Sequence, residues 1–104
     1  MKFTMEDAKA YEDWITEMAD AVVDVKRRDY SGDEDPYANF RQSILVGVEP
    51  WRGVMVRMMD KLSRLKNITE AGEAKVKDES VNDTIADLIN YARILGGLLK
   101  EIEI

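Results

Sequence analysis

The residues best suited to chemistry in this 104-residue sequence are three acidic side chains spaced four apart, Glu79, Asp83 and Asp87. In a helix, residues at this spacing lie one above the other, so the three carboxylates form a stripe that Asn90 continues. Like charges four apart destabilise an isolated helix by a few tenths of a kcal/mol per pair, which favours an external reason such as a bound cation. A solvated outer face gives the same pattern, so helix geometry alone leaves both interpretations open.

An earlier segment carries the opposite charge, with Arg57, Lys61 and Arg64 along one helix edge and Asp60 among them. One interpretation is that a metal on the acidic stripe and cations from this edge together grip a polyphosphate, stabilising the charge that develops as a phosphoanhydride breaks. The other is a salt-bridged surface that contributes little to stability. Judged from the residues alone, the salt-bridged surface is the favoured interpretation.

The sequence has no cysteine and no histidine, which excludes disulfides, thiolate nucleophiles, imidazole bases and conventional zinc sites. A bound metal would be a hard cation with oxygen ligands, and Mg²⁺ is the leading candidate, followed by Mn²⁺. The acidic segment 29–35 does not fit a calcium loop of the EF-hand type. Counted from Asp29, the glycine position holds Glu34 and the bidentate glutamate position holds Phe40.

Apolar periodicity predicts an all-α protein with about four helices in a small bundle, forming one domain over residues 1–104. The first helix is long, begins at an N-cap formed by Thr4 with Asp7 three residues later, and ends near residues 28–30. A short second helix follows Pro36 and stops at Gly47, and a third runs from Pro50 to about residue 67. After a connection over 69–77, a long last helix begins near residue 78, with an apolar stripe of Val81, Ile85, Leu88, Ala92, Leu95 and Leu99.

The composition of the chain disfavours some classes of binding partner. The net charge of −6 disfavours duplex nucleic acid and anionic membranes, and the sequence contains neither a signal peptide nor an apolar run of membrane-spanning length. We therefore expect a cytoplasmic protein. A chain of this size gains from self-association, and the apolar stripe of the first helix is compatible with a homodimer.

Three segments together resemble a known family: Asp29-Tyr30 with Asn39-Phe40, then residues 57–65, then the last helix reading DESVNDTIADLINY. The chain is similar over residues 22–99 to the nucleotide-modification-associated domain family of small phage and bacterial proteins. It is more distantly similar to the all-α nucleoside triphosphate pyrophosphohydrolases of the MazG and dimeric dUTPase type. Those enzymes hold magnesium with acidic residues from two helices.

The resemblance implies magnesium-dependent nucleotide binding in nucleotide metabolism, with pyrophosphohydrolysis as the reaction and a phage genome as the source. It implies metal ligation by the acidic stripe and phosphate contacts from the basic edge. Asp60 is then a further metal ligand or the general base that activates water, and Asn39, Asn90 and Tyr91 contact the base or sugar. The pyrophosphohydrolases carry one set of acidic residues on each of two successive helices. In this sequence the helix before the last carries only Asp60 of the first set.

A second hypothesis involves no catalysis. In it, the chain is a compact acidic helical domain of phage type that binds and inhibits a host protein. The net charge and the incomplete acidic set favour it. A stable complex with a host protein, without metal-dependent ligand binding, would distinguish it from a nucleotide-binding protein.

Overall fold

The computed structural model describes residues 2–30, 35–71 and 78–104, and gives only the backbone for residues 24–30 and 78–80. Its elements are α1 (Met5–Tyr30), the 3₁₀ helix η1 (Ala38–Val46), α2 (Pro50–Ala71) and α3 (Asp78–Glu101). The described residues contain no strand, which confirms the all-α prediction with four helices. None of the described helices is long and apolar enough to cross a membrane.

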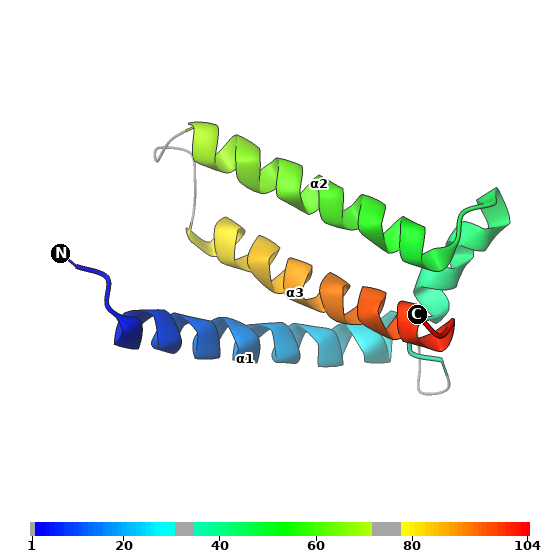
Figure 1. Cartoon of the computed structure of the whole chain (residues 1–104), viewed down its shortest axis with the longest axis horizontal. Helices are drawn as coiled ribbons and strands as arrows, with labels where there is room; N and C mark the ends of the chain where they lie inside the picture. Colours follow the sequence, from blue (N-terminus) through cyan, green and yellow to red (C-terminus); the bar gives the residue numbers. More distant parts are fainter. Residues whose placement is uncertain (1, 31–34, 72–77) are drawn as a thin grey trace.

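The three long helices lie side by side, with α3 between α1 and α2, and η1 lies at the end where α2 begins and α3 finishes (Figure 1). α3 packs against both neighbours, and η1 packs on α2. The chain is elongated, with extents of 49 × 28 × 27 Å. Because α3 lies between two long helices, it positions side chains for two different interfaces.

The start of α1 agrees with the predicted capping box. The Thr4 amide donates to Oδ2 of Asp7 at 2.9 Å, and the Asp7 amide donates to Oγ1 of Thr4 at 3.1 Å. These two bonds satisfy backbone donors that the first turn of a helix leaves without partners. They also hold the pKa of Asp7 below its ordinary value, chiefly through the bond with the Thr4 backbone.

The second helix differs in type from the three long ones. η1 is a 3₁₀ helix that ends, as predicted, at Gly47, whose φ of 78° lies in the left-handed region that suits glycine. The Gly47 amide donates to the carbonyl of Ile44 at 3.0 Å, and the Val48 amide donates to that of Ser43 at 3.0 Å. η1 has no fully buried residue, so contacts at its ends and on one side hold it in place.

Two predictions about the long helices were wrong. α2 continues to Ala71, beyond the expected end near residue 67, and two local contacts accompany the additional turn. The Thr69 hydroxyl donates to the Lys66 carbonyl at 2.9 Å, and Lys66 lies 3.7 Å from Glu70. In α3 the fully buried residues are not those of the predicted apolar stripe; they are Thr84, Ala86, Asn90, Ile94 and Leu98.

The described core consists of two clusters on α3. Toward α1, Ile15 and Ala19 pack against Ala86, with the half-buried Met18, Ile85 and Ile89 around them. Toward α2, Val54 packs against Ile94 and Leu98, surrounded by larger, half-buried side chains: Tyr37, Phe40, Trp51, Met58, Tyr91 and Leu95. The two neighbours of α3, rather than its most apolar stripe, thus decide which of its residues are buried.

Candidate functional site

A hollow of about 340 Å³ opens on the side of α2 that carries its basic edge. Its lining residues are Arg57, Asp60, Lys61, Arg64 and Tyr91. The volume lies within the range of small-molecule sites, about 300–1,000 Å³. Four of these residues come from three successive turns of α2, and Tyr91 comes from α3, so the hollow depends on the packing of these two helices.

The electrostatics of the hollow differ from those of the whole chain. Three cations and one carboxylate line it, whereas the chain carries a net charge of −6. Arg57, Asp60 and Arg64 are exposed, so their charged groups are accessible to a ligand from solution. A concentration of positive charge in a concave site favours an anion.

Lys61 connects the two helices. Its Nζ lies 3.1 Å from Oδ2 of Asp87, and the two side chains are only 26% and 21% exposed. This pair joins the predicted basic edge of α2 to the predicted acidic stripe of α3. Because Asp87 already neutralises Lys61 in part, Arg57 and Arg64 carry most of the uncompensated positive charge of the hollow.

Aromatic rings position the residues at one end of the hollow. The guanidinium carbon of Arg57 lies 5.0 Å from the centroid of the Phe40 ring, a distance at which a cation is attracted to the face of a ring. Phe40 in turn meets Tyr91 edge-on, with centroids 6.4 Å apart and planes at 90°. In the sequence, Phe40 belongs to the Asn39-Phe40 pair of the family resemblance, and no pattern there predicts that it supports two residues of the hollow.

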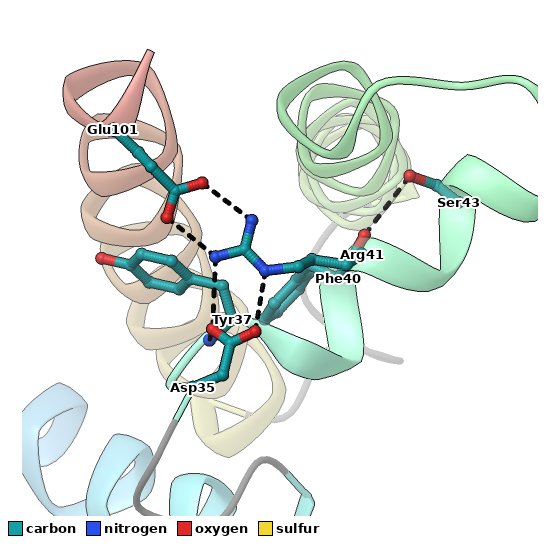
Figure 2. A network of polar contacts seen from close by, with 6 residues as sticks. All are labelled: Asp35, Tyr37, Phe40, Arg41, Ser43 and Glu101. Atoms are coloured by element: carbon teal, nitrogen blue, oxygen red, sulfur yellow. Dashed lines mark hydrogen bonds and ion pairs between the residues drawn. The ribbon is translucent and has the colours of Figure 1, made fainter. Parts of the chain in front are cut away.

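Behind these rings, an ion-pair network fastens η1 to the end of α3 (Figure 2). The Arg41 guanidinium lies between two carboxylates, with Nε donating to Oδ2 of Asp35 at 2.8 Å and Nη1 donating to Oε1 of Glu101 at 2.8 Å. These bonds from Arg41 hold the pKa of Asp35 and of Glu101 below their ordinary values, and they raise the pKa of Arg41. Asp35 also accepts from the Tyr37 amide at 3.0 Å, a bond in the turn that precedes η1.

Five of the ten predicted site residues thus line one hollow, and Asp87 lies beside it through Lys61. Asp83 is exposed one turn earlier in α3 and is not a lining residue. The side chain of Glu79 lies outside the described residues. Among the described residues no three carboxylates come together at a place that could hold a metal.

The two asparagines lie elsewhere. Asn90 is only 7% exposed, and its Nδ2 donates to the Ala19 carbonyl of α1 at 2.9 Å, while its Oδ1 accepts from Arg93 at 3.2 Å. This position gives Asn90 a structural role between α3 and α1, and its geometry does not support the predicted contact with a nucleotide. Asn39 is half-buried in η1 and does not line the hollow, although it precedes Phe40.

Comparison with known proteins adds one finding. Residues 49–98 match the family model of nucleotide modification associated domain 1, which confirms the expected resemblance over this part of the chain. No curated protein and no solved structure was found to match the chain significantly. The matched segment begins just before α2 and ends three residues before the end of α3, so it contains every residue that lines the hollow.

Proposed function

We propose that this chain binds a nucleotide through its phosphates at the α2–α3 hollow, with Arg57 and Arg64 as the principal phosphate contacts. The observation that carries the proposal is the gathering of three cations and a tyrosine around one concavity in an acidic chain. Guanidinium groups suit phosphate because their planar fork donates two parallel hydrogen bonds. The family name, which refers to nucleotide modification, agrees with this ligand class.

Tyr91 supplies an aromatic wall to the same site. Its ring is half-buried among the residues packed on Val54, Ile94 and Leu98, so its position is fixed before a ligand arrives. A tyrosine held in this way offers an edge and a hydroxyl to a base or sugar at little cost in side-chain entropy.

Magnesium fits this site as a companion of the nucleotide rather than as a permanently held ion. Mg²⁺ commonly uses one or two carboxylates together with substrate phosphates and water, and Asp60 offers one carboxylate at the hollow. When bound there, the ion would neutralise phosphate charge. Asp87 would become a second ligand only by exchanging its pairing with Lys61.

We propose pyrophosphohydrolysis as the reaction to assay, with Asp60 as the group that accepts a proton from water. Asp60 is exposed at the hollow among cations that attract phosphate, a placement compatible with a general base. We further propose a nucleotide-metabolic role in a phage-encoded, cytoplasmic protein.

The test compares two arginines of one helix. Arg64 lines the hollow, whereas Arg52 stacks on Trp51 at 4.5 Å and lies 3.6 Å from Glu49, away from the lining residues. We expect Arg64→Gln to weaken binding of a nucleoside triphosphate with Mg²⁺ by about 10- to 100-fold, the effect of removing a charged hydrogen-bond donor worth about 1.5–3 kcal/mol. Arg52→Gln should leave the affinity unchanged.

Calorimetric titration with nucleoside mono-, di- and triphosphates, each with and without Mg²⁺, measures these affinities. Affinity should increase with the number of phosphates and decrease with added salt. Equal losses in the two variants, or no binding of any nucleotide by the unmodified chain, would overturn the assignment.

A further inference from the structure

The three cations of the hollow are held in three different ways. Lys61 is paired with the carboxylate of Asp87 at 3.1 Å. Arg57 lies over the ring of Phe40, with its guanidinium carbon 5.0 Å from the ring centroid. Arg64 has neither an ion pair nor a ring contact within the part of the chain that the structure describes. The hollow therefore combines a partly neutralised cation, a positioned cation and a cation with neither constraint.

A ring constrains an arginine differently from a carboxylate. A carboxylate accepts hydrogen bonds from the guanidinium group and compensates its charge, as Asp35 and Glu101 do for Arg41. The face of a ring attracts the cation through its quadrupole but carries no net charge. Arg57 therefore has a preferred position, while its charge and its hydrogen-bond donors remain available to another acceptor.

Phe40 can constrain Arg57 because Phe40 is itself held in place. Its ring is half-buried in the core cluster between α2 and α3, and it meets the Tyr91 ring edge-on. Its amide donates to the Tyr37 carbonyl at 2.9 Å, and its carbonyl accepts from the Ser43 hydroxyl at 3.3 Å (Figure 2). Both the ring and the backbone of Phe40 are therefore fixed by contacts within the chain.

The close approach of η1 to α2 brings Phe40 to Arg57. Gly53 lies one turn before Arg57 and thus on the same side of α2. A Cβ at Gly53 would lie 3.4 Å from the Cβ of Ser43 in η1, so the two helices are in contact at this point. Phe40 does not itself line the hollow. Any effect of Phe40 on a ligand must therefore act through residues that do.

We propose that Phe40 is a positioning residue for phosphate binding, which orders Arg57 at the hollow before a ligand arrives and does so without neutralising its charge. This inference rests on the proposed function, because it requires that Arg57 contacts phosphate. A side chain that is ordered in advance loses less conformational entropy on binding, an advantage of about 2- to 12-fold in affinity for one flexible side chain. Arg64 has no such advantage.

A double-mutant cycle on the full chain tests the proposal. The probe is inorganic tripolyphosphate with Mg²⁺, which has no base or sugar, so that changes at Tyr91 do not enter the measurement. Phe40→Leu keeps an apolar side chain in the cluster and removes the ring face, so the affinity measured by calorimetric titration should fall by about 3- to 10-fold. In an Arg57→Gln background the same substitution should have no effect. Equal losses in the two backgrounds would overturn the proposal.

Two further variants separate positioning from a loss of packing. Phe40→Tyr restores a ring at the same place and should bind tripolyphosphate within about twofold of the unmodified chain. Trp51→Leu removes another ring of the same cluster that also has an arginine over it, because the Arg52 guanidinium carbon lies 4.5 Å from the Trp51 centroid. Arg52 does not line the hollow, so Trp51→Leu should lower stability but not affinity. Equal losses of affinity in Phe40→Leu and Trp51→Leu would assign Phe40 to packing alone.

A measurement on the free protein distinguishes failure of this inference from failure of the proposed function. The NMR order parameter of the Arg57 Nε–H group should lie above about 0.6 in the unmodified chain and below that value in Phe40→Leu. An Arg57 side chain that is equally mobile in both proteins would overturn the positioning role. Unchanged tripolyphosphate affinity in Phe40→Leu would also overturn it and would leave the proposed function intact. An unmodified chain that does not bind tripolyphosphate would overturn the proposed function itself, whatever the order of Arg57.

Discussion

The two sides of α3 are built from different kinds of contact. Toward α1, small side chains allow close approach, and Asn90 donates to a backbone carbonyl of the neighbouring helix. Toward α2, large rings and a partly exposed ion pair leave a hollow that solvent enters. α3 thus supplies a closed structural interface toward α1 and an open site toward α2. The two lie about 140° apart around the axis of the helix.

The difference between the two sides of α3 explains why Asn90 and Asp87, which belong to one predicted stripe, have different roles. Asn90 lies on the side of α3 that approaches α1, and burial there requires that its polar atoms have partners. Asp87 lies toward α2, where it meets a lysine next to the hollow. Similar spacing in the sequence therefore does not make residues members of one site when a helix has neighbours on two sides.

The largest expected effect comes from the α1 side. Asn90→Ala removes the bond to the Ala19 carbonyl and the bond from Arg93, and it leaves a cavity where the Asn90 side chain is only 7% exposed, which should lower the free energy of unfolding by about 1–3 kcal/mol. Urea unfolding at fixed protein concentration measures the loss. Nucleotide affinity should not change under conditions where the variant is folded.

The control for this variant is Asn82→Ala. Asn82 accepts a hydrogen bond from the Tyr11 hydroxyl at 2.9 Å in an exposed position, where water replaces the lost partner, so its cost should stay below about 1 kcal/mol. If Asn90→Ala weakened nucleotide binding without loss of stability, the separation of α3 into two sides would fail.

A smaller effect is expected where η1 meets α3. A Cβ at Gly97 would overlap the Tyr37 hydroxyl, so Gly97→Ala must displace the ring and with it the start of η1. The overpacking cost of about 1–3 kcal/mol is offset in part by the gain of about 0.5–1 kcal/mol from replacing a helical glycine, for a net loss of roughly 0.5–2 kcal/mol. Thermal and urea unfolding both measure it.

The neighbouring glycine provides a matched control. Nothing lies within 4 Å of a Cβ at Gly96, so Gly96→Ala should stabilise the chain by about 0.5–1 kcal/mol. Destabilisation by both substitutions to the same extent would mean that Tyr37 does not pack on Gly97 as described.

The smallest effect concerns acid. Because the folded-state pKa values of Asp35 and Glu101 are lowered by Arg41, the network stabilises the chain above the ordinary carboxylate range and loses this contribution as pH falls through the lowered values. The Arg41→Met variant lacks the network, so its melting temperature should be lower at pH 7 and should decrease less between pH 5 and pH 2. Parallel curves for the two proteins would show that the network contributes nothing to stability.

Much of the fold could be predicted because its signals are local. Thr4 and Asp7 form a capping box within one turn, and Gly47 ends η1 through its own backbone conformation. The end of α2 was missed because its last turn has no apolar periodicity, and the contacts of Lys66 and Thr69 replace that signal. Local patterns do not predict the buried side of α3, because that depends on where α1 and α2 pack.

The part of the candidate site that follows from helical spacing could also be predicted. Arg57, Lys61 and Arg64 share an edge by helical spacing alone, and the structure keeps them together around the hollow. The support from Phe40 comes from a separate helix and depends on tertiary packing. The link from Arg41 to Glu101 spans 60 residues, and no short-range pattern in the sequence predicts it.

The 3₁₀ helix η1 makes the hollow responsive to local opening of the chain. η1 has no fully buried residue, so its separate unfolding exposes less apolar surface and costs less free energy than unfolding of the whole molecule. Its amide protons should therefore exchange with solvent sooner than those at the centre of α3. Arg57 lies over Phe40 of η1, so a ligand that binds Arg57 in that position also shifts η1 toward its closed state. Occupancy of the hollow should therefore slow amide exchange in η1, although η1 does not line the hollow.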